Sequence, residues 1–223
     1  ADRPKEAELY LEKSVQFANN KQNKLRSQCM LVHLYFVNNK NEKAMDLAKK
    51  MYKASPSEFY AISSMADALM RFKKYDEGFA LLKKGKLLFP NGFDNFDFEE
   101  EYLSGLVHAG RYEQAKTLAK QMLIKKPNDS EIWQCLMEVA RKTHNKKEAE
   151  VAMKHLNNLK LTDSEAMEVG FGGISAGAAD SALPLLKQAV ETNPDSVDLI
   201  MNTRDPKAEK KFLNTRDKVQ QRK

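Results

Sequence analysis

A glycine-rich run, Gly170-Phe171-Gly172-Gly173, is the segment of this sequence most similar to a phosphate-binding loop. Such a loop holds phosphate oxygens with backbone N–H groups, follows a strand and ends in Gly-Lys-Ser/Thr. Here no strand pattern precedes the run, and no Gly-Lys-Ser/Thr follows Gly177. We therefore interpret these glycines as points of close helix packing. Because each glycine within a helix costs up to about 1 kcal/mol, we expect the surrounding segment, residues 163–196, to be the least stable repeat.

The side chains that most often bind metals or act as nucleophiles are few and scattered. Histidines occur at His33, His108, His144 and His155, and the cysteines are Cys29 and Cys135. They form no HExxH pair, and the cysteines lie too far apart in the sequence to suggest a bridge or a four-ligand zinc site. We expect no metal, no cofactor and no small-molecule substrate. His33 and His108 are candidates for contacts that depend on pH.

Carboxylates that might act as an acid–base pair do not converge either. Glu99, Glu100 and Glu101 are consecutive, so on a helix they point in different directions. There is also no nucleophile elbow. The sequence therefore predicts that this protein is not an enzyme.

Composition indicates an ordinary folded chain made largely of helices. Of its 223 residues, 42% are hydrophobic and 30% are charged, and only 9 are glycine and 7 proline. That is too apolar for wholesale disorder and leaves little material for turns. No run approaches the ~20 apolar residues of a membrane span. The first residues lack a signal-peptide pattern, so we expect a cytoplasmic location, although a processed exported form is compatible with this sequence.

The positive charge is concentrated at the carboxyl end. The net charge is +6, but residues 204–223 contain eight basic and three acidic side chains, so they carry +5 and the rest carries +1. A nearly neutral body does not indicate a polyanion-binding surface. The basic tail, which contains Phe212, is predicted to be a solvated helix, with docking to an acidic partner, a membrane surface or RNA as alternatives.

Regularly spaced prolines reveal an internal repeat. Pro56, Pro90, Pro127 and Pro194 are separated by 34, 37 and 67 residues, and Leu161 occupies the missing slot. Each closes a lysine-rich helical pattern such as AKTLAKQMLIKKP. Twelve residues before each closing residue stands a small side chain, which we call the crossing position: Ala44, Gly78, Ala115, Ala149 and Ala182. Small residues there allow two helices to cross at about 8 Å.

This pattern resembles the tetratricopeptide (TPR) family. The resemblance implies an all-α, right-handed α-solenoid of about five helix-turn-helix repeats with an extra helix at each end. We expect the repeats at residues 25–58, 59–95, 96–129, 130–162 and 163–196. Residues 1–20 would be a lone second helix or amino-terminal cap, and residues 197–223 a basic capping helix and tail. Asp129-Ser130-Glu131 and Asp163-Ser164-Glu165 are expected to begin helices.

In this family the first helix of each repeat lines a concave groove. The resemblance therefore implies a set of partner-contacting residues: His33, Phe36, Tyr60, Ser63, Asp67, Met70, Arg71, Asp97, Glu100, Glu101, Ser104, Glu131 and Glu138. The set is apolar at one end and acidic in its middle. TPR proteins that bind the carboxyl-terminal tail of a chaperone hold the tail's carboxylate with Lys, Arg and Asn side chains. Asp67 stands here at the position of that Asn, so we do not expect this protein to bind a chaperone tail. The alternative is that these acids merely solvate a helix face.

These features predict a protein–protein interaction scaffold, an adaptor or an assembly subunit of a larger complex. Its partner would be a basic or mixed-charge peptide or helix, because complementary potentials favour binding. One alternative is a structural segment of a longer repeat array without a peptide groove. Another is RNA binding through the basic tail and the basic convex face formed by the second helices, whose lysines include Lys49, Lys50, Lys83, Lys84, Lys116, Lys120, Lys125 and Lys126.

Four phenylalanines lie in or next to the segment that carries three extra residues between the second and third repeats. They are Phe89, Phe93, Phe96 and Phe98. We expect some of them to fill the enlarged gap between repeats. The alternative is that Phe93 is exposed as an anchor for a partner, since aromatic side chains supply much interface energy.

Overall fold

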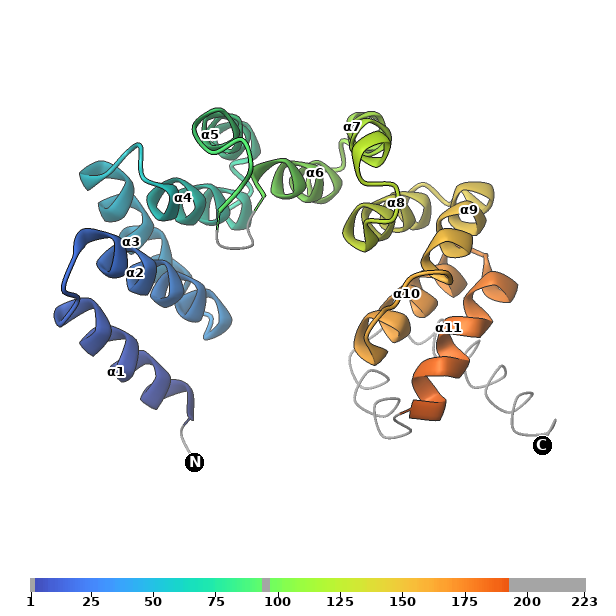
Figure 1. Ribbon diagram of the computed structural model, residues 1–223, viewed down its shortest axis with the longest axis horizontal. Coiled ribbons are helices and arrows are strands. Elements are labelled where there is room, and N and C mark those ends of the chain that lie inside the picture. Colours follow the sequence, from blue (N-terminus) through green and yellow to red (C-terminus); the bar gives the residue numbers. More distant parts are fainter. Residues whose placement is uncertain (1–2, 94–96, 193–223) are drawn as a thin grey trace. The chain divides into compact units, whose positions relative to one another are not determined.

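The computed structural model describes residues 3–93 and 97–192, and in these ranges the regular structure is α-helical. Phe96, Pro194 and the helix expected within residues 197–223 lie outside the described residues. The helices form successive hairpins, so the prediction of an all-α fold made of helix-turn-helix repeats is confirmed. Figure 1 shows the hairpins in chain order.

Six helices lie wholly or mostly in the amino-terminal half of the chain. They are α1 (Arg3–Gln16), α2 (Lys21–Val37), α3 (Asn41–Ala54), α4 (Phe59–Arg71), α5 (Tyr75–Leu88) and α6 (Phe98–His108). The others are α7 (Tyr112–Lys125), α8 (Ser130–Lys142), α9 (Lys146–Leu156), α10 (Asp163–Ser175) and α11 (Ala179–Thr192). Even-numbered helices are the first helices of repeats and odd-numbered helices are second helices, with α1 in the place of the expected lone second helix.

The chain divides into two compact units, Ala1–Gly105 and Leu106–Lys223, which we call unit 1 and unit 2. In unit 1, α2 packs against α1, α3 and α4, and α4 also packs against α3 and α5. In unit 2, α8 packs against α7, α9 and α10, while α11 packs against α9 and α10. The first helices α2, α4, α8 and α10 are thus each held between their own second helix and a neighbouring hairpin.

The crossing positions are buried in every repeat. Ala44, Ala115, Ala149 and Ala182 are at most 1% exposed, and Gly78 is buried as well. A Cβ atom on Gly78 would lie only 3.0 Å from the Met70 Sδ atom of α4. The small residues therefore sit where the backbones of a hairpin approach each other, as the sequence pattern predicts.

The turn between the two helices of each repeat has a residue in the left-handed region. The five residues are Asn39, Lys73, Gly110, His144 and Gly177, with φ between 53° and 84°. In each turn, the N–H group of the following residue bonds back to a carbonyl near the end of the first helix. This closes the first helix in the manner of a Schellman-type cap. Lys73 and His144 adopt this conformation without being glycine, which costs stability.

Helix starts partly follow the sequence expectations. The Asp129 carboxylate accepts hydrogen bonds from the Glu131 and Ile132 N–H groups and caps α8 as expected. In α10 the cap is Thr162, one residue earlier than the expected Asp163. The reason is that Thr162 and Glu165 complete a reciprocal capping box, which satisfies two backbone N–H groups instead of one. The Thr162 N–H and hydroxyl groups both donate to Glu165, and these bonds lower the pKa of Glu165.

The extra segment between the second and third repeats is anchored by an aromatic cluster centred on Phe59 of α4. The rings of Phe89, Phe93 and Phe98 lie 5.0–5.3 Å from the Phe59 ring, centroid to centroid. Phe98 is fully buried, whereas Phe93 covers the cluster and remains 46% exposed. Aromatic side chains therefore fill this gap as expected. Phe93 packs against the cluster on one side and is exposed to solvent on the other.

Glycines of α10 also pack closely rather than bind phosphate. A Cβ atom on Gly170 would lie 2.5 Å from a Leu186 methyl group of α11, and one on Gly173 would lie 2.9 Å from the Met153 sulfur atom of α9. Gly172 is different, because the nearest neighbour of its Cβ atom would be the Met137 Cγ atom at 4.0 Å. The predicted close helix packing is confirmed for Gly170 and Gly173.

Candidate protein-binding faces of the first helices

Exposed side chains of α2 and α4, together with the half-buried Asp67, form the most complete candidate site in unit 1. We define the unit 1 first-helix face as Met30, His33, Val37, Asp67 and Arg71. The three α2 residues follow the spacing of one helical stripe, and all three are exposed, with Met30 at 53% and Val37 at 61%. Helices α2 and α4 pack against each other, and Arg71 of α4 lies over the ring of Phe36, the residue before Val37, so the α4 residues reach the Val37 end of this stripe.

Arg71 joins the two helices of this face. Its Nε atom donates to the Asp67 Oδ1 atom at 2.8 Å, and its guanidinium carbon lies 4.8 Å from the centre of the Phe36 ring on α2. Phe36 itself is buried. The structure thus brings the predicted residues Phe36, Asp67 and Arg71 together, with the charged pair at the surface and the ring beneath it.

Three further predicted contact residues of unit 1 have packing roles. Tyr60 is buried, with its ring edge-on to Phe59, and Ser63 is buried and donates from its hydroxyl group to the Tyr60 carbonyl oxygen at 3.3 Å. Met70 is half-buried and fills the space beside Gly78 and Gly105, both of which its side chain nearly touches. These residues shape the face from below rather than forming its surface.

Asp97 is largely occupied with holding the start of α6. Its Oδ1 atom accepts hydrogen bonds from the Glu99 N–H group at 2.8 Å and from the Lys86 ammonium group of α5 at 3.1 Å. Lys86 also bonds to Glu99 at 3.2 Å. Burial alone would lower the pKa of Lys86, but the hydrogen bonds to the two carboxylates outweigh it and raise this pKa.

The other predicted residues of α6 lie on the same helix without converging on one point. Glu100 and Ser104 are half-buried and one turn apart, and Glu101 is exposed. Glu99, Glu100 and Glu101 occupy the first turn of α6. Their negative charges stabilise this helix, because the amino-terminal end of a helix carries a partial positive charge.

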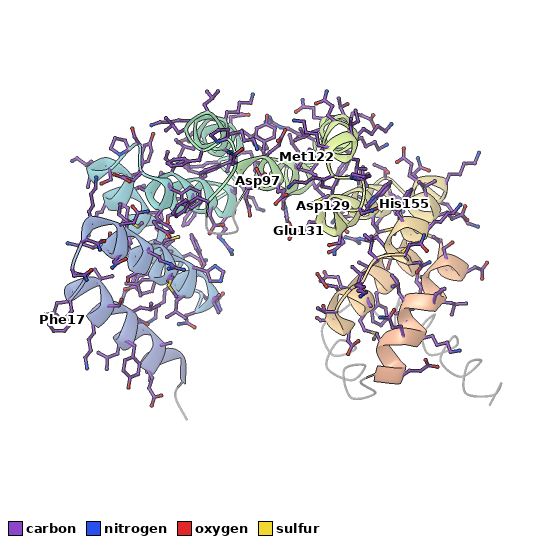
Figure 2. The ribbon with its side chains drawn as sticks, in the orientation of Figure 1. Phe17, Asp97, Met122, Asp129, Glu131 and His155 are labelled. Atoms are coloured by element: carbon purple, nitrogen blue, oxygen red, sulfur yellow. The ribbon has the colours of Figure 1, made fainter. Side chains whose placement is uncertain are left out.

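In unit 2 the predicted residues lie on α8. Glu131 is exposed beside the cap residue Asp129, and Figure 2 shows both at the start of this helix. Glu138 accepts two hydrogen bonds from Arg141, at 2.6 Å and 2.5 Å, and lies 3.8 Å from the Lys142 ammonium group. The bidentate pair fixes Glu138 on the exposed side of α8.

The charge of these faces is more balanced than the residue types suggest. Asp67, Asp97 and Glu138 each pair with a basic side chain: Arg71, Lys86 and Arg141, respectively. Basic residues of the same or the adjacent helix therefore offset much of the expected negative charge.

Sequence reasoning overlooked Met30. It lies three residues before His33 and seven before Val37, so the helical spacing of the three residues was the available signal. Met30 does not stand at a groove position of the TPR motif, so the predicted set of contact residues lacks it. Among the described residues, no group of three or more His, Cys, Asp or Glu side chains is arranged to hold a metal ion. In the same part of the chain, each helix is too short or too polar to cross a membrane.

Comparisons with known proteins establish the fold. No protein-family model and no curated protein sequence matches this chain. Among solved structures, it is similar to PilW, a widely conserved type IV pilus biogenesis factor, with 13% identity and a TM-score of 0.62 over 96% of this chain and 99% of PilW. It is also similar to TTC0263, a TPR protein of Thermus thermophilus, with 18% identity and a TM-score of 0.58 over 80% of this chain and 96% of that one.

A third similar structure is MamA (41-end) from Desulfovibrio magneticus RS-1, with 14% identity and a TM-score of 0.53 over 77% of this chain and 96% of that one. Sequence identities this low establish a shared fold and nothing finer. The chain has a TPR-type fold.

Proposed function

We propose that this protein is a non-catalytic interaction scaffold whose unit 1 first-helix face binds an amphipathic helix or peptide of a partner protein. The observation that carries the proposal is the exposure of Met30 and Val37 on one stripe of α2, next to the Asp67–Arg71 ion pair. Apolar side chains beside a charged pair are typical of the core and rim of an interface.

The paired charges favour a partner of mixed charge over a purely basic one. A basic peptide would have to compete with Arg71 for the Asp67 carboxylate, whereas a partner carrying both signs can contact both members of the pair. The apolar stripe requires partner residues that repeat at helical spacing, as in helix-in-groove recognition. The similarity to PilW, a biogenesis factor, supports a role in assembling a larger complex.

The test compares two double variants with the same chemical change. Met30→Asp with Val37→Asp alters the unit 1 first-helix face, and Leu9→Asp with Leu87→Asp alters exposed leucines on the second helices α1 and α5. Partners are recovered on immobilised protein, and the affinity of the most abundant one is then measured by isothermal titration calorimetry. We expect the first variant to weaken binding at least tenfold, because anchor residues of an interface contribute about 1–2 kcal/mol each or more. We expect the second variant to change binding less than twofold.

Equal loss in both variants, or none in the first, would remove this face from the proposal. Circular dichroism should show the same helix content in both variants, because all four positions are at least half exposed in the native protein. A second pair tests the charges. Asp67→Lys removes the carboxylate that pairs with Arg71 and should weaken binding. Asp67→Arg combined with Arg71→Asp restores an ion pair with the two charges exchanged and should recover part of the lost affinity.

A further inference from the structure

One exposed position of the second helices carries lysine in all five repeats. It lies seven residues before each closing residue, and the five lysines are Lys49, Lys83, Lys120, Lys154 and Lys187. Each of them is exposed. Other exposed positions of these helices vary in residue type, so helix-end preference for basic residues does not account for this one position.

Unit 2 contains three of these lysines on neighbouring helices. Lys120 lies on α7, Lys154 on α9 and Lys187 on α11, and we call these three residues the lysine ladder. A salt bridge of 3.0 Å from Lys116 to Glu148 joins α7 to α9, and α9 packs directly against α11. Figure 1 shows the three helices following one another along one side of unit 2. The axes of helices in direct contact, such as α9 and α11, lie about 8–10 Å apart.

Three acidic groups on the helices that carry the ladder pair with lysines outside it. Glu113 and Glu148 both pair with Lys116, and Glu150 pairs with Lys146. Within the described residues, Lys120 and Lys154 form no ion pair. Lys187 makes one long contact, 3.7 Å to Glu191, and both side chains are more than half exposed. Such an exposed pair is weak and would be exchanged readily for a partner carboxylate.

An exposed apolar side chain lies one turn from each ladder lysine. These are Ile124 beside Lys120, Val151 beside Lys154, and Pro184 beside Lys187. Ile124 is 84% exposed and Val151 is 54% exposed. Each ladder lysine therefore has an aliphatic group within one helical turn, on its carboxyl-terminal side in α7 and on its amino-terminal side in α9 and α11.

We propose that the lysine ladder and its neighbouring aliphatic residues bind an extended acidic peptide that carries a carboxylate at about every third residue. Three residues of polyproline II chain span about 9 Å and bring the side chain back to the same face, and this length is close to the axial separation of helices in contact. Intervening apolar residues of the peptide would contact Ile124 and Val151. Single-stranded nucleic acid fits less well, because its bases need aromatic stacking partners and this surface offers aliphatic ones.

This surface belongs to the second helices of unit 2, so its test is independent of the function proposed for unit 1. The probe is a fluorescein-labelled peptide of about twelve residues made of repeated Glu-Ser-Val, whose carboxylates recur on one side of the chain in the polyproline II conformation. A comparison peptide has the same composition with its glutamates in one block, and an oligo(dT) of similar charge serves as the nucleic-acid arm. Binding is measured by fluorescence anisotropy at low salt.

The ladder variant is Lys120→Glu, Lys154→Glu and Lys187→Glu. Its matched control is Lys125→Glu, Lys147→Glu and Lys160→Glu, which changes the net charge of unit 2 equally at exposed positions off the ladder. We expect the spaced peptide to bind more tightly than the blocked one. The ladder variant should lower its affinity about tenfold or more, and the control less than threefold, since three exposed ion pairs together amount to about one decade of affinity.

Any of three results would overturn the proposal: equal loss of affinity in ladder and control variants, equal affinity for spaced and blocked peptides, or tighter binding of oligo(dT) than of the spaced peptide. The first two would show that only net charge matters. The third would assign the surface to nucleic acid. Tryptophan fluorescence of Trp133, the only tryptophan, reports whether unit 2 stays folded in each variant.

Discussion

The contact between Gly85 and Phe98 supports a prediction that can be worked out in detail. Gly85 lies in α5, and a Cβ atom built there would be 2.3, 2.4 and 2.6 Å from three atoms of the Phe98 ring. Carbon atoms attract each other best at about 3.5–4.0 Å, so Gly85→Ala creates an overlap of about 1 Å with three atoms at once. The ring has to move, or the two helices have to separate.

Neither movement is free, because Phe98 is fully buried and its ring lies 5.3 Å from Phe59 and 6.2 Å from Phe89, centroid to centroid. Overpacking of this kind costs about 1–3 kcal/mol, while the change from glycine to alanine in a helix contributes about 1 kcal/mol in the other direction. Because three ring atoms are overlapped at once, we take the upper part of the overpacking range, about 2–3 kcal/mol, and expect a net loss of about 1–2 kcal/mol. Gly172→Ala is the control, because its Cβ atom would have 4.0 Å to its nearest neighbour and only the favourable contribution remains.

Thermal unfolding followed by far-ultraviolet circular dichroism measures both variants. For a chain of this size, 1 kcal/mol corresponds to about 2–4 °C, so we expect the transition to fall by several degrees in Gly85→Ala and to rise slightly in Gly172→Ala. Adding Phe98→Leu to Gly85→Ala should recover part of the loss, because the smaller side chain removes ring atoms from the overlap. A neutral or stabilising Gly85→Ala would refute the placement of Phe98 against α5.

Three further predictions concern local features of both units. Lys73→Gly should stabilise unit 1 by about 1 kcal/mol in a thermal melt, because φ is 59° at this turn, and unchanged stability would contradict that conformation. Glu165→Gln should cost about 1 kcal/mol at neutral pH. Because the hydrogen bonds from Thr162 lower the pKa of Glu165, the difference from wild type should be complete above the ordinary pKa of 4.5, shrink as the pH falls below it and vanish once the pH lies below the lowered value, as urea unfolding at a series of pH values would show. His155→Ala should shift the Trp133 emission to longer wavelength, since the two rings are stacked 3.8 Å apart, and an unshifted spectrum would rule out the stack.

The fold was predictable because it depends mainly on small residues at regularly spaced positions, and this spacing can be recognised in a single sequence. A hairpin of two helices tolerates only small side chains where the backbones cross, so Ala44, Gly78 and their equivalents report the architecture directly. The left-handed turn residues were less visible. Gly110 and Gly177 suggest such turns, but Lys73 and His144 occupy the same place with side chains that disfavour it. Tertiary packing of the hairpin overrides the local preference there.

The surface was less predictable, because charge depends on pairing and pairing depends on side-chain positions. Asp67 reads as a negative charge in the sequence, yet Arg71 on the next turn neutralises it and at the same time covers Phe36. Asp97 was expected to face a partner, but it lies just before α6 and satisfies the Glu99 N–H group. The position of a residue in the repeat motif predicts which helix face it lies on. It does not show whether a neighbouring group already pairs with that residue.

The glycines show how the chain accommodates departures from a regular repeat. At the position five residues before each closing residue, the other repeats carry Met51, Met122, Leu156 and Ala189, all buried, whereas the second repeat carries Gly85. The volume missing there is supplied by Phe98 from the start of α6, directly after the three-residue insertion. In the fifth repeat, Gly170 is matched in the same way by Leu186. A glycine in one helix and a large side chain in its neighbour therefore act as one packing unit, which explains why the longer linker does not interrupt the hydrophobic core of unit 1.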